Sequence, residues 1–445
     1  YRTQQEGARS YANENGTSTK VNPEPLKIHD FDTSTNGDKL DISDLLQNEA
    51  ENYQGNNPFQ SGHLKLVQNG NDCNLIFNKS GSNTNSKSTT VAQFVNKRAA
   101  DFAATHFSPV FSPDGKNDPD QVLNGTNSND TLIGAGGNDT IHGLNGNDTI
   151  QGNAGSDVIS GGAGNDTIDG GFGDDRVDGG TGNDTITDNQ GVNTLKGGAG
   201  DDTITSKSLT LTSRLVGGDG NDRLEATGKS VTLMGGNGDD RIDANAQLRS
   251  EQGAQSTYAM DAEANIDGGE GSDTINVRYY NQTTVNGGDG KDRIDLDYVG
   301  DSLVNGGDGD DRIDIYFNGN RNGSSKQRTG FTTDIHGDGG NDHLSIKGYS
   351  YTWDGGEKTT ATGGEGNDTI EIVDRYAGTS NGSSSHGIRS AKADGGPGDD
   401  QFTIAGVIKP EITTGPGRDI IKLTAQQYRT QQEGARSYAN ENGTS

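Results

Sequence analysis

The sequence predicts an all-β fold, a parallel β-roll or β-solenoid of about fourteen coils, next to a small α+β flanking domain. Three observations predict it. Aspartates recur nine residues apart from Asp130 to Asp184. An aliphatic residue stands two positions after each of them, as Ile150 follows Asp148. Glycine supplies 70 of the 445 residues and clusters between the aspartates, where it lets the chain turn tightly.

The repeating unit is Gly-Gly-x-Gly-x-Asp-x-aliphatic-x, which is most regular from Gly161 to Asp184. Carbonyl oxygens of the glycine turn and one Asp carboxylate form the hard oxygen cage that Ca²⁺ prefers. The aliphatic residue points inward from a short strand, so that two nonamers make one coil, and successive coils stack about 4.8 Å apart. The nonamer resembles the RTX (haemolysin-type) calcium-binding family. That resemblance implies a right-handed roll, with each Ca²⁺ held between turns of neighbouring coils on the same edge.

After Asp184 the repeat thins from two motifs per coil to one. Asn193 occupies the Asp position of the next nonamer, which predicts a weak or empty site there. One edge keeps its motif through all the coils, whereas the other edge loses it after Asp175. The candidate calcium ligands are Asp130, Asp139, Asp148, Asp157, Asp166, Asp175, Asp184, Asp202, Asp222, Asp240, Asp273, Asp292, Asp311, Asp342, Asp368, Asp400 and Asp419.

The composition is that of a chain that needs cations to fold. Hydrophobic residues make up only 27% and the formal net charge is −29, a combination typical of disordered chains. The strict periodicity argues against disorder. About 15 Ca²⁺ ions, one per turn, would nearly cancel this charge. Metal binding is therefore predicted to be the folding event.

The composition also narrows the classes of function. A polyanion is a poor partner for nucleic acid, and no apolar run is long enough for membrane insertion. The single cysteine, Cys73, has no partner for an internal disulfide. The sequence contains neither H-E-x-x-H nor G-x-S-x-G, the motifs of zinc proteases and serine hydrolases. We therefore predict no catalytic residue and no enzymatic activity.

Residues 1–120 contain no nonamer and are predicted to form the flanking or cap domain. Within them, residues 26–46 predict a strand, a turn and a short helix. Residues 63–81 predict a β-hairpin with Asn69-Gly70 in its turn. Residues 89–107 fit either a strand or a helix, and the sequence does not decide between them.

A second resemblance lies in this domain. The pair Asp30-Phe31 is followed by the run Gly-Asp-Lys-Leu-Asp-Ile-Ser at residues 37–43. This pattern resembles the domain that follows RTX repeats in type I secretion substrates, where it caps the last coil and seeds folding. Here it precedes the repeats, which departs from the family's order.

Residues 121–205 are predicted to form a two-edged roll, and residues 206–427 a one-edged solenoid with loop insertions. We expect the insertions on the edge that lacks motifs or along a face. On a rigid scaffold such loops either bind partners or are surface decoration. The insertions lie near residues 245–263, 318–329, 348–360 and 374–389.

The first 18 residues recur unchanged at residues 428–445. An identity of this length is not accidental, so we expect the chain to be one tile, plus the start of the next, of a tandem array. A cloning artefact and a choice of register in a periodic fibre are the alternatives. In the array interpretation, copies of the chain are partners of one another, head to tail.

These observations predict a calcium-dependent, extracellular structural protein, a tile of a surface fibre, adhesin stalk, S-layer or matrix filament. The family resemblance implies a bacterial protein exported by type I secretion, folding when it meets calcium outside the cell. One alternative is a calcium-stabilised module that binds a ligand such as a cell-surface glycan or ice. Another is the RTX part of a larger secreted toxin or enzyme.

Overall fold

The computed structural model describes the chain in two compact units, Tyr1–Pro119 and Asp120–Ser445. The described residues are 25–34, 37–42, 45–46, 58–59, 62–80, 88–103, 106–108, 119–188, 190–207, 212–246, 262–297, 299–318, 332–349, 358–374, 388, 390–407 and 409–423.

The first unit contains a four-stranded sheet in the order β1-β5-β4-β3. Strand β1 (Leu26–Ile28) runs parallel to β5 (Ser88–Phe94). Strand β4 (Asp72–Asn78) runs antiparallel to both β5 and β3 (Leu64–Asn69). The predicted hairpin is confirmed, but its two-residue turn is Gly70-Asn71, one residue later than predicted, because Asn69 pairs with Asp72. Gly70 has a positive φ of 62°, as tight hairpin turns require.

The undecided segment 89–107 contains the strand β5, the 3₁₀ turn η1 (Ala99–Asp101) and the start of β6 (Phe107–Ser108). Strand β6 pairs in parallel with β2 (Leu40–Asp41). The Leu46 N–H donates to the Ile42 carbonyl at 3.1 Å, one helical hydrogen bond of the predicted helix. The residues around this predicted helix lie partly outside the described ranges. The α+β character of this unit therefore stays a prediction.

Aromatic rings form the core of the first unit. Phe31, Phe94 and Phe102 are buried, and their ring centroids lie 5.0 Å (Phe31–Phe94) and 4.7 Å (Phe94–Phe102) apart. Such edge-to-face contacts add stability beyond the buried area. This unit thus has an apolar core of its own, built mainly from aromatic rings.

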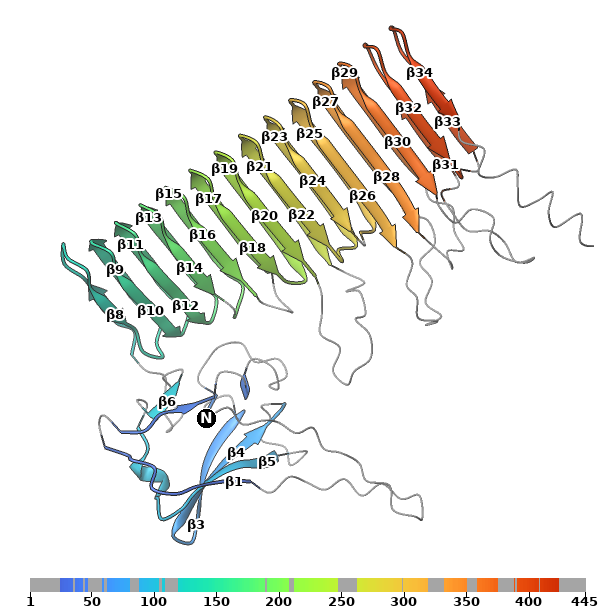
Figure 1. The fold of residues 1–445 in the computed structure, drawn as a ribbon. Helices are drawn as coiled ribbons and strands as arrows, with labels where there is room; N and C mark the ends of the chain where they lie inside the picture. Colours follow the sequence, from blue (N-terminus) through green and yellow to red (C-terminus); the bar gives the residue numbers. More distant parts are fainter. Residues whose placement is uncertain are drawn as a thin grey trace, which may run out of the picture. The chain divides into compact units, whose positions relative to one another are not determined.

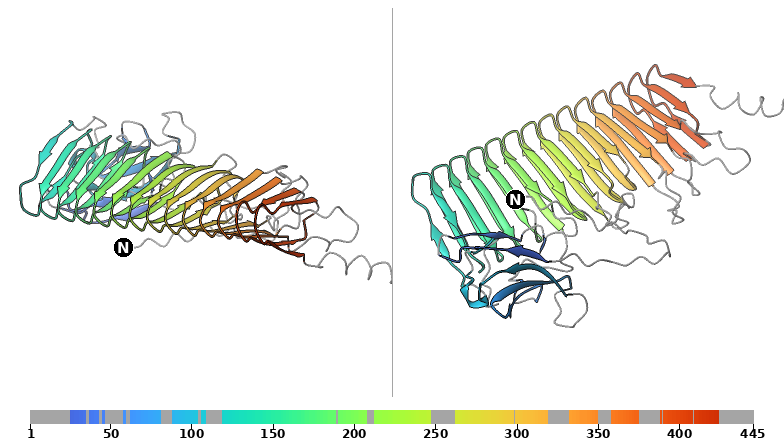
Figure 2. Two further views of the ribbon diagram at one scale, coloured as in Figure 1. Left: turned by 90° about the horizontal axis from the view of Figure 1, so that it is seen from above. Right: turned by 60° about the horizontal axis from the view of Figure 1, so that its bottom comes forward.

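The second unit is a solenoid of two 14-stranded parallel sheets, one of odd-numbered and one of even-numbered strands (Figure 1, Figure 2). One odd and one even strand make each coil, which confirms the predicted all-β solenoid of about fourteen coils. The odd strands are β7 (Val122–Asn124), β9 (Thr140–Asn145), β11 (Val158–Ala163), β13 (Arg176–Thr181), β15 (Thr194–Ala199), β17 (Thr212–Asp219), β19 (Ser230–Asn237), β21 (Glu263–Glu270), β23 (Gln282–Asp289), β25 (Asp301–Asp308), β27 (Thr332–Gly339), β29 (Lys358–Glu365), β31 (Ser390–Asp394) and β33 (Lys409–Thr413). The even strands are β8 (Thr131–Ile133), β10 (Thr149–Ala154), β12 (Thr167–Phe172), β14 (Thr185–Asp188), β16 (Thr203–Ser206), β18 (Arg223–Thr227), β20 (Arg241–Asn245), β22 (Thr274–Arg278), β24 (Arg293–Asp297), β26 (Arg312–Asn318), β28 (His343–Tyr349), β30 (Thr369–Asp374), β32 (Gln401–Ala405) and β34 (Ile420–Leu423).

The strand register places equivalent residues of successive coils next to one another. Ile150 pairs with Leu132 on one side and with Ile168 on the other, so one aliphatic column runs through the interior of the even sheet. Side chains alternate between interior and surface along each strand, and the inward column is buried in a single apolar core. The core is narrow: the first coils place one aliphatic side chain per strand in it, and many later strands place two, as Ile313 and Ile315 do on β26. It agrees with the low hydrophobic content of the chain.

The prediction that the residue two positions after each motif aspartate is buried inside the roll is wrong at one position. In the last coil Ile421 is 46% exposed, and its neighbour Ile420 is 61% exposed. Strand β34 is the edge strand of its sheet, so among the described residues no further coil covers these side chains. The first coil shows the same end effect at Val122 and Ile133, which are 70% and 53% exposed.

The insertions all begin and end at one edge of the roll. Each falls between an even strand and the next odd strand, for example between β20 and β21. The structure thus confirms that they begin and end at the edge that has no predicted calcium motif after Asp175. The residues of these loops lie largely outside the described ranges, as do residues 1–18 and 428–445.

Candidate metal sites at the turns

The predicted ligands lie at the turns of the roll, each directly before a strand. Fourteen of them precede even strands and form one unbroken column along one edge, from Asp130 to Asp419. Asp139, Asp157 and Asp175 precede odd strands and form a short column on the opposite edge. The structure therefore brings the predicted residues together as two columns, with neighbours in adjacent coils.

One oxygen of every motif carboxylate after Asp130 joins adjacent coils. The Oδ1 atom of Asp166 accepts the backbone N–H of Asp148 at 2.8 Å, and the Oδ1 atom of Asp184 accepts that of Asp166 at 2.8 Å. The same bond recurs between every adjacent pair in the long column, ending at Asp400 N–H to Asp419 Oδ1 at 3.1 Å. Half of each carboxylate is thus committed to stacking the backbone.

The second oxygen of the interior aspartates has no hydrogen-bond partner although it is buried. This holds for the Oδ2 atoms of Asp148, Asp157, Asp166, Asp175, Asp184, Asp202, Asp222, Asp240, Asp273, Asp292, Asp311, Asp342, Asp368 and Asp400. One unsatisfied buried acceptor costs about 1–3 kcal/mol, and more when it is charged. A column of such oxygens is therefore a strong indication that a cation completes each turn.

The turns at the beginning of both columns differ. The Oδ2 atom of Asp130 accepts the Thr126 N–H at 2.6 Å, and that of Asp139 accepts the Ala135 N–H at 2.8 Å. At the other end of the long column, Asp419 is partly exposed. The first and last turns thus lack the unpaired buried oxygen that marks the interior.

Main-chain carbonyls complete the arrangement at each turn. A Cβ atom placed on Gly161 would collide with the Oδ2 atom of Asp166 and would lie 2.6 Å from the carbonyl oxygen of Gly179, one coil further on. We call this space, which the first glycine of each motif leaves open between a carboxylate and a carbonyl of the next coil, the cradle. Gly152 and Gly287 each face an equivalent pair of oxygens, one from the carboxylate of their own motif and one from a carbonyl of the next coil.

The donor set of the cradle fits calcium. In the described part of the chain, no three His, Cys, Asp or Glu side chains gather into a metal-binding group, so each ion would be held by one carboxylate together with backbone carbonyls. Carboxylate and carbonyl oxygens are the ligands of hard cations, and Ca²⁺ accepts the irregular geometry of such sites. A bound Ca²⁺ would supply the positive charge that these oxygens lack.

Burial shifts the proton affinity of the motif carboxylates. Desolvation by burial raises the pKa of Asp157 to about 8 and that of Asp184 and Asp240 to about 7. An unfolded Asp loses its proton near its ordinary pKa of 3.8, whereas the folded, cation-free group keeps it to a higher pH. Without a cation, the free energy of unfolding of the roll therefore falls as the pH rises from about 4 to about 8.

Substitution of two motif aspartates is expected to have unequal effects. Asp166→Ala removes a buried carboxylate, its cradle oxygen and the acceptor of the Asp148 N–H, which should cost about 1–3 kcal/mol before any loss of metal. Asp419→Ala acts in the last, partly exposed coil and should cost less. Circular dichroism during calcium titration measures both midpoints, and equal midpoints would contradict this account of the sites.

The eroded motif around Leu144 keeps its cradle. Leu144 stands at a glycine position with a φ of 81°, a left-handed conformation that costs a non-glycine residue free energy. Asp148 in this turn still has a buried, unpaired Oδ2 atom. The coils on both sides therefore hold the turn in its repeat conformation despite the missing glycine.

The sequence analysis singled out Asn193 but missed Asp188. Asn193 is satisfied: its Oδ1 atom accepts the Asp175 N–H at 2.9 Å and its Nδ2 atom donates to the Gln190 carbonyl at 2.8 Å. Asp188 has a buried, unpaired Oδ2 atom like the motif aspartates. It stands at a position where the preceding coils have glycine, so comparing whole turns rather than only Asp positions could have found it.

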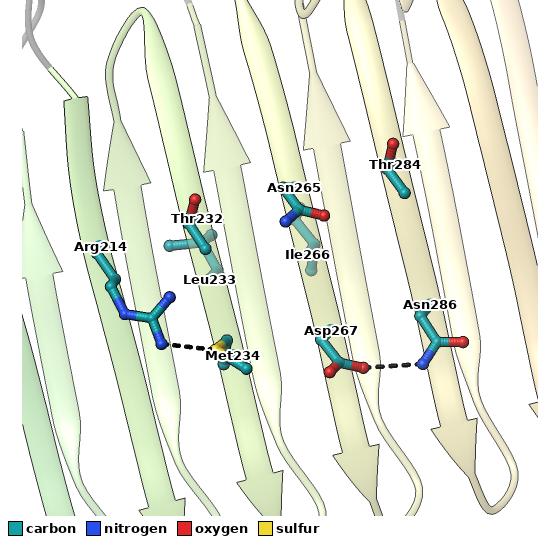
Figure 3. Close-up of a pocket in the computed structure, with 9 residues that line it drawn as sticks. All are labelled: Arg214, Thr232, Leu233, Met234, Asn265, Ile266, Asp267, Thr284 and Asn286. Carbon is teal, nitrogen blue, oxygen red and sulfur yellow. Dashed lines mark hydrogen bonds between the residues drawn. The ribbon is translucent and has the colours of Figure 1, made fainter.

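A shallow hollow lies elsewhere, on the outward side of β17, β19, β21 and β23 (Figure 3). Its volume is about 240 Å³, below the range usual for small-molecule sites. Half of its polar side chains are already paired, since Asn286 donates to Asp267 at 2.9 Å and the Arg214 guanidinium donates to the Met234 sulfur at 3.1 Å. The hollow is therefore a weaker candidate site than the cradles.

Comparison with known protein families agrees with this geometry. The family model described as RTX calcium-binding nonapeptide repeat (4 copies) matches residues 120–150, 142–177, 151–186, 178–207, 216–247 and 355–371. A comparison with curated proteins found no match. The matched segments contain both edges of the two-edged section and several motifs of the one-edged section.

Proposed function

This chain is an RTX-repeat protein that carries calcium-binding repeats, and on that premise we propose that it is an extracellular structural protein, each copy one tile of a head-to-tail fibre, adhesin stalk, S-layer or matrix filament. The observation that carries the proposal is the column of buried, unpaired carboxylate oxygens. A roll built this way folds only where Ca²⁺ is abundant, which favours a protein that stays unfolded inside the cell and folds after export.

A mechanical role is supported by the continuity of the roll. Parallel strand pairing runs without a break from β8 to β34 and from β7 to β33, and the Asp-to-Asp hydrogen bonds run beside it along one edge. In such solenoids each coil contacts only its neighbours. The stiffness of the roll therefore comes from the same coil-to-coil contacts repeated along its length. We infer no catalytic role, and the absence of enzymatic activity stays a prediction.

Head-to-tail assembly is supported by the sequence and by the ends of the roll. The identity of residues 1–18 with 428–445 indicates a tandem unit. The first coil (β7, β8) and the last coil (β33, β34) are each paired on one side only among the described residues. Strands with a free edge pair readily with further chain, so both ends offer a place for a neighbouring copy or a cap.

The expected location is supported by the family and by one finding on the fold. RTX-repeat proteins are typically secreted. None of the helical segments in the described ranges has the length and apolar character needed to cross a membrane. With a formal charge of −29, association with nucleic acid is disfavoured.

The fibre proposal is tested by following the size of the full chain in Ca²⁺. We expect sedimentation and negative-stain microscopy to show linear, single-file oligomers in millimolar Ca²⁺, and a monomer in EGTA. A variant that lacks residues 428–445 should keep the β-sheet circular dichroism in Ca²⁺ but should no longer extend. A folded full-length chain that remains monomeric at high concentration in Ca²⁺ would overturn the head-to-tail proposal.

A ligand-binding module is the second candidate function, and the hollow over β17–β23 is the observation that favours it. Glycan-array binding of the folded chain in Ca²⁺ tests this candidate. Binding that is lost on Asp267→Ala but not on a substitution outside the hollow would favour a glycan-binding module. A catalytic domain in adjoining sequence would favour the third candidate, a larger toxin or enzyme.

A further inference from the structure

Asp188 occupies a glycine position of the short motif column. Thr187 pairs with Asp169 in the neighbouring coil, and Gln151 pairs with Asp169 in the coil before. The residues that come next in the chain, Gly152, Gly170 and Asp188, are therefore equivalent in successive coils. The column of first glycines on this edge ends in an aspartate.

The side chain of Asp188 takes the place of a backbone carbonyl. A Cβ atom placed on Gly152 would collide with the Asp157 Oδ2 atom and with the carbonyl oxygen of Gly170. A Cβ atom placed on Gly170 would instead collide with the Asp188 Oδ2 atom and would lie 3.0 Å from the Asp175 Oδ2 atom. The cradle at Gly170 is thus bounded by two carboxylates, where the cradle at Gly152 has one.

Both carboxylates are buried and neither Oδ2 atom is satisfied. Asp175 is 2% exposed and Asp188 is 0% exposed, and both Oδ2 atoms lack a hydrogen-bond donor while both groups are ionised. Their Oδ1 atoms are occupied, since that of Asp175 accepts the Asp157 N–H at 2.7 Å and that of Asp188 accepts the Gln190 N–H at 3.2 Å. Two unpaired acceptors therefore face one small space.

The charged side chains that act most strongly on this pair are other aspartates. Burial raises the pKa of Asp175 to about 7, hydrogen bonds from the Asp157 N–H and from a protonated Asp188 oppose this rise, and the charges of Asp174 and Asp169 add to it. Asp169 and Asp175 likewise raise the pKa of Asp188. Two buried carboxylates this close repel each other strongly unless a cation or a proton lies between them.

We propose that Asp175 and Asp188 form a two-carboxylate Ca²⁺ site that closes the short edge of the roll and binds its ion more tightly than the single-carboxylate cradles. The formal charge of the two side chains, −2, balances one divalent ion, whereas each ordinary cradle supplies −1. Affinity of calcium sites rises with the number of charged ligands and with their rigidity. The site lies where the two-edged section ends, so it fixes the turn after which the motif is lost.

The test substitutes Asp188 in the full chain and measures calcium binding. Asp188→Asn keeps the shape and one oxygen but removes a charge, and we expect the calcium midpoint of folding, followed by circular dichroism, to rise about threefold to tenfold. Asp188→Ala removes the oxygen as well, and equilibrium dialysis against radioactive Ca²⁺ should count about one ion fewer per chain at saturation.

The matched control is Asp178→Asn. Asp178 lies on β13, the strand between Asp175 and Asp188. Its half-exposed carboxylate is paired only loosely with Lys196, at 3.5 Å, so the substitution removes one negative charge of the same section outside the cradle. We expect its calcium midpoint to stay at the wild-type value or to fall slightly, because an exposed ion pair contributes little.

A shared proton is the competing explanation for the pair, and it predicts the opposite result. If Asp175 and Asp188 hold a proton, Asp188→Asn relieves repulsion and leaves the calcium midpoint unchanged or lower, and Asp188→Ala binds as many ions as wild type. Either result would overturn the proposal. It rests on the calcium-dependent fold proposed above, and that premise fails separately if the wild-type chain itself binds no Ca²⁺.

Discussion

Chelation of calcium with EGTA at neutral pH is expected to abolish most of the β-sheet circular dichroism of the chain, and added Ca²⁺ is expected to restore it. The reason is the interior of the motif columns, where buried carboxylates such as Asp166 and Asp240 carry an oxygen without a partner. Their ionised forms are costly to bury without a cation, and the chain as a whole carries a charge of −29.

The residual signal in EGTA should come from the first unit. Its core is the aromatic cluster of Phe31, Phe94 and Phe102, which needs no metal. Two controls separate specific binding from charge screening. Sodium chloride at equal ionic strength screens the repulsion but provides no ligand-bound ion, so it should restore little. Mg²⁺ demands a stricter octahedral geometry and should restore less than Ca²⁺. A spectrum unchanged by EGTA would count against metal-coupled folding.

The second large effect is expected from Gly161→Ala. The new methyl group would occupy the cradle itself, since it would collide with the Asp166 Oδ2 atom and crowd the Gly179 carbonyl. No oxygen is removed, so the substitution blocks the ion rather than its ligands. Overpacking of this kind costs about 1–3 kcal/mol, and loss of the ion adds to it. We expect the calcium midpoint to rise about tenfold or more, measured by circular dichroism.

The matched control for Gly161→Ala is Ala163→Gly in the same turn. It removes one methyl group from a half-buried position outside the cradle and should cost less than about 1 kcal/mol, mainly through backbone entropy. Calcium midpoints that rise equally for the two variants would show that the turn is sensitive to any change. In that case the open space at Gly161 would not be the ion's position.

Much of the roll could be predicted because its sequence period is its structural period. A shift of one coil carries Asp148 onto Asp166 and Ile150 onto Ile168, so one nonamer defines strand, turn and inward column together. End effects could not be predicted this way. Ile421 has the same local sequence context as buried members of its column, yet its exposure depends on whether a further coil covers it.

The different roles of the two oxygens in each motif carboxylate could be seen only in the structure. A sequence pattern marks Asp166 as a ligand but does not show that its Oδ1 atom holds the neighbouring coil's backbone while its Oδ2 atom stays unpaired. Asp188 was missed for a related reason. Its role depends on substituting for a carbonyl oxygen of the coil, and a pattern built on side chains assigns that position only to glycine.

The first unit was harder to predict because it has no repeat. Residues 89–107 mix alternating and consecutive apolar residues, and tertiary packing decides between strand and helix. In the structure, β5 pairs with both β4 and β1, and the 3₁₀ turn η1 comes after it, with Arg98 and Asp101 joined by a 2.7 Å ion pair. Long-range strand pairing of this kind leaves little trace in a single sequence.

Electron density from crystals grown in Ca²⁺ tests the central claim most directly, because it shows each cradle separately. The account predicts a calcium peak, identified by its anomalous signal, at about 2.3–2.6 Å from the Oδ2 atom of Asp166 and of the other interior motif aspartates. A map in which the strands stack as described while those cradles hold no ion would contradict it.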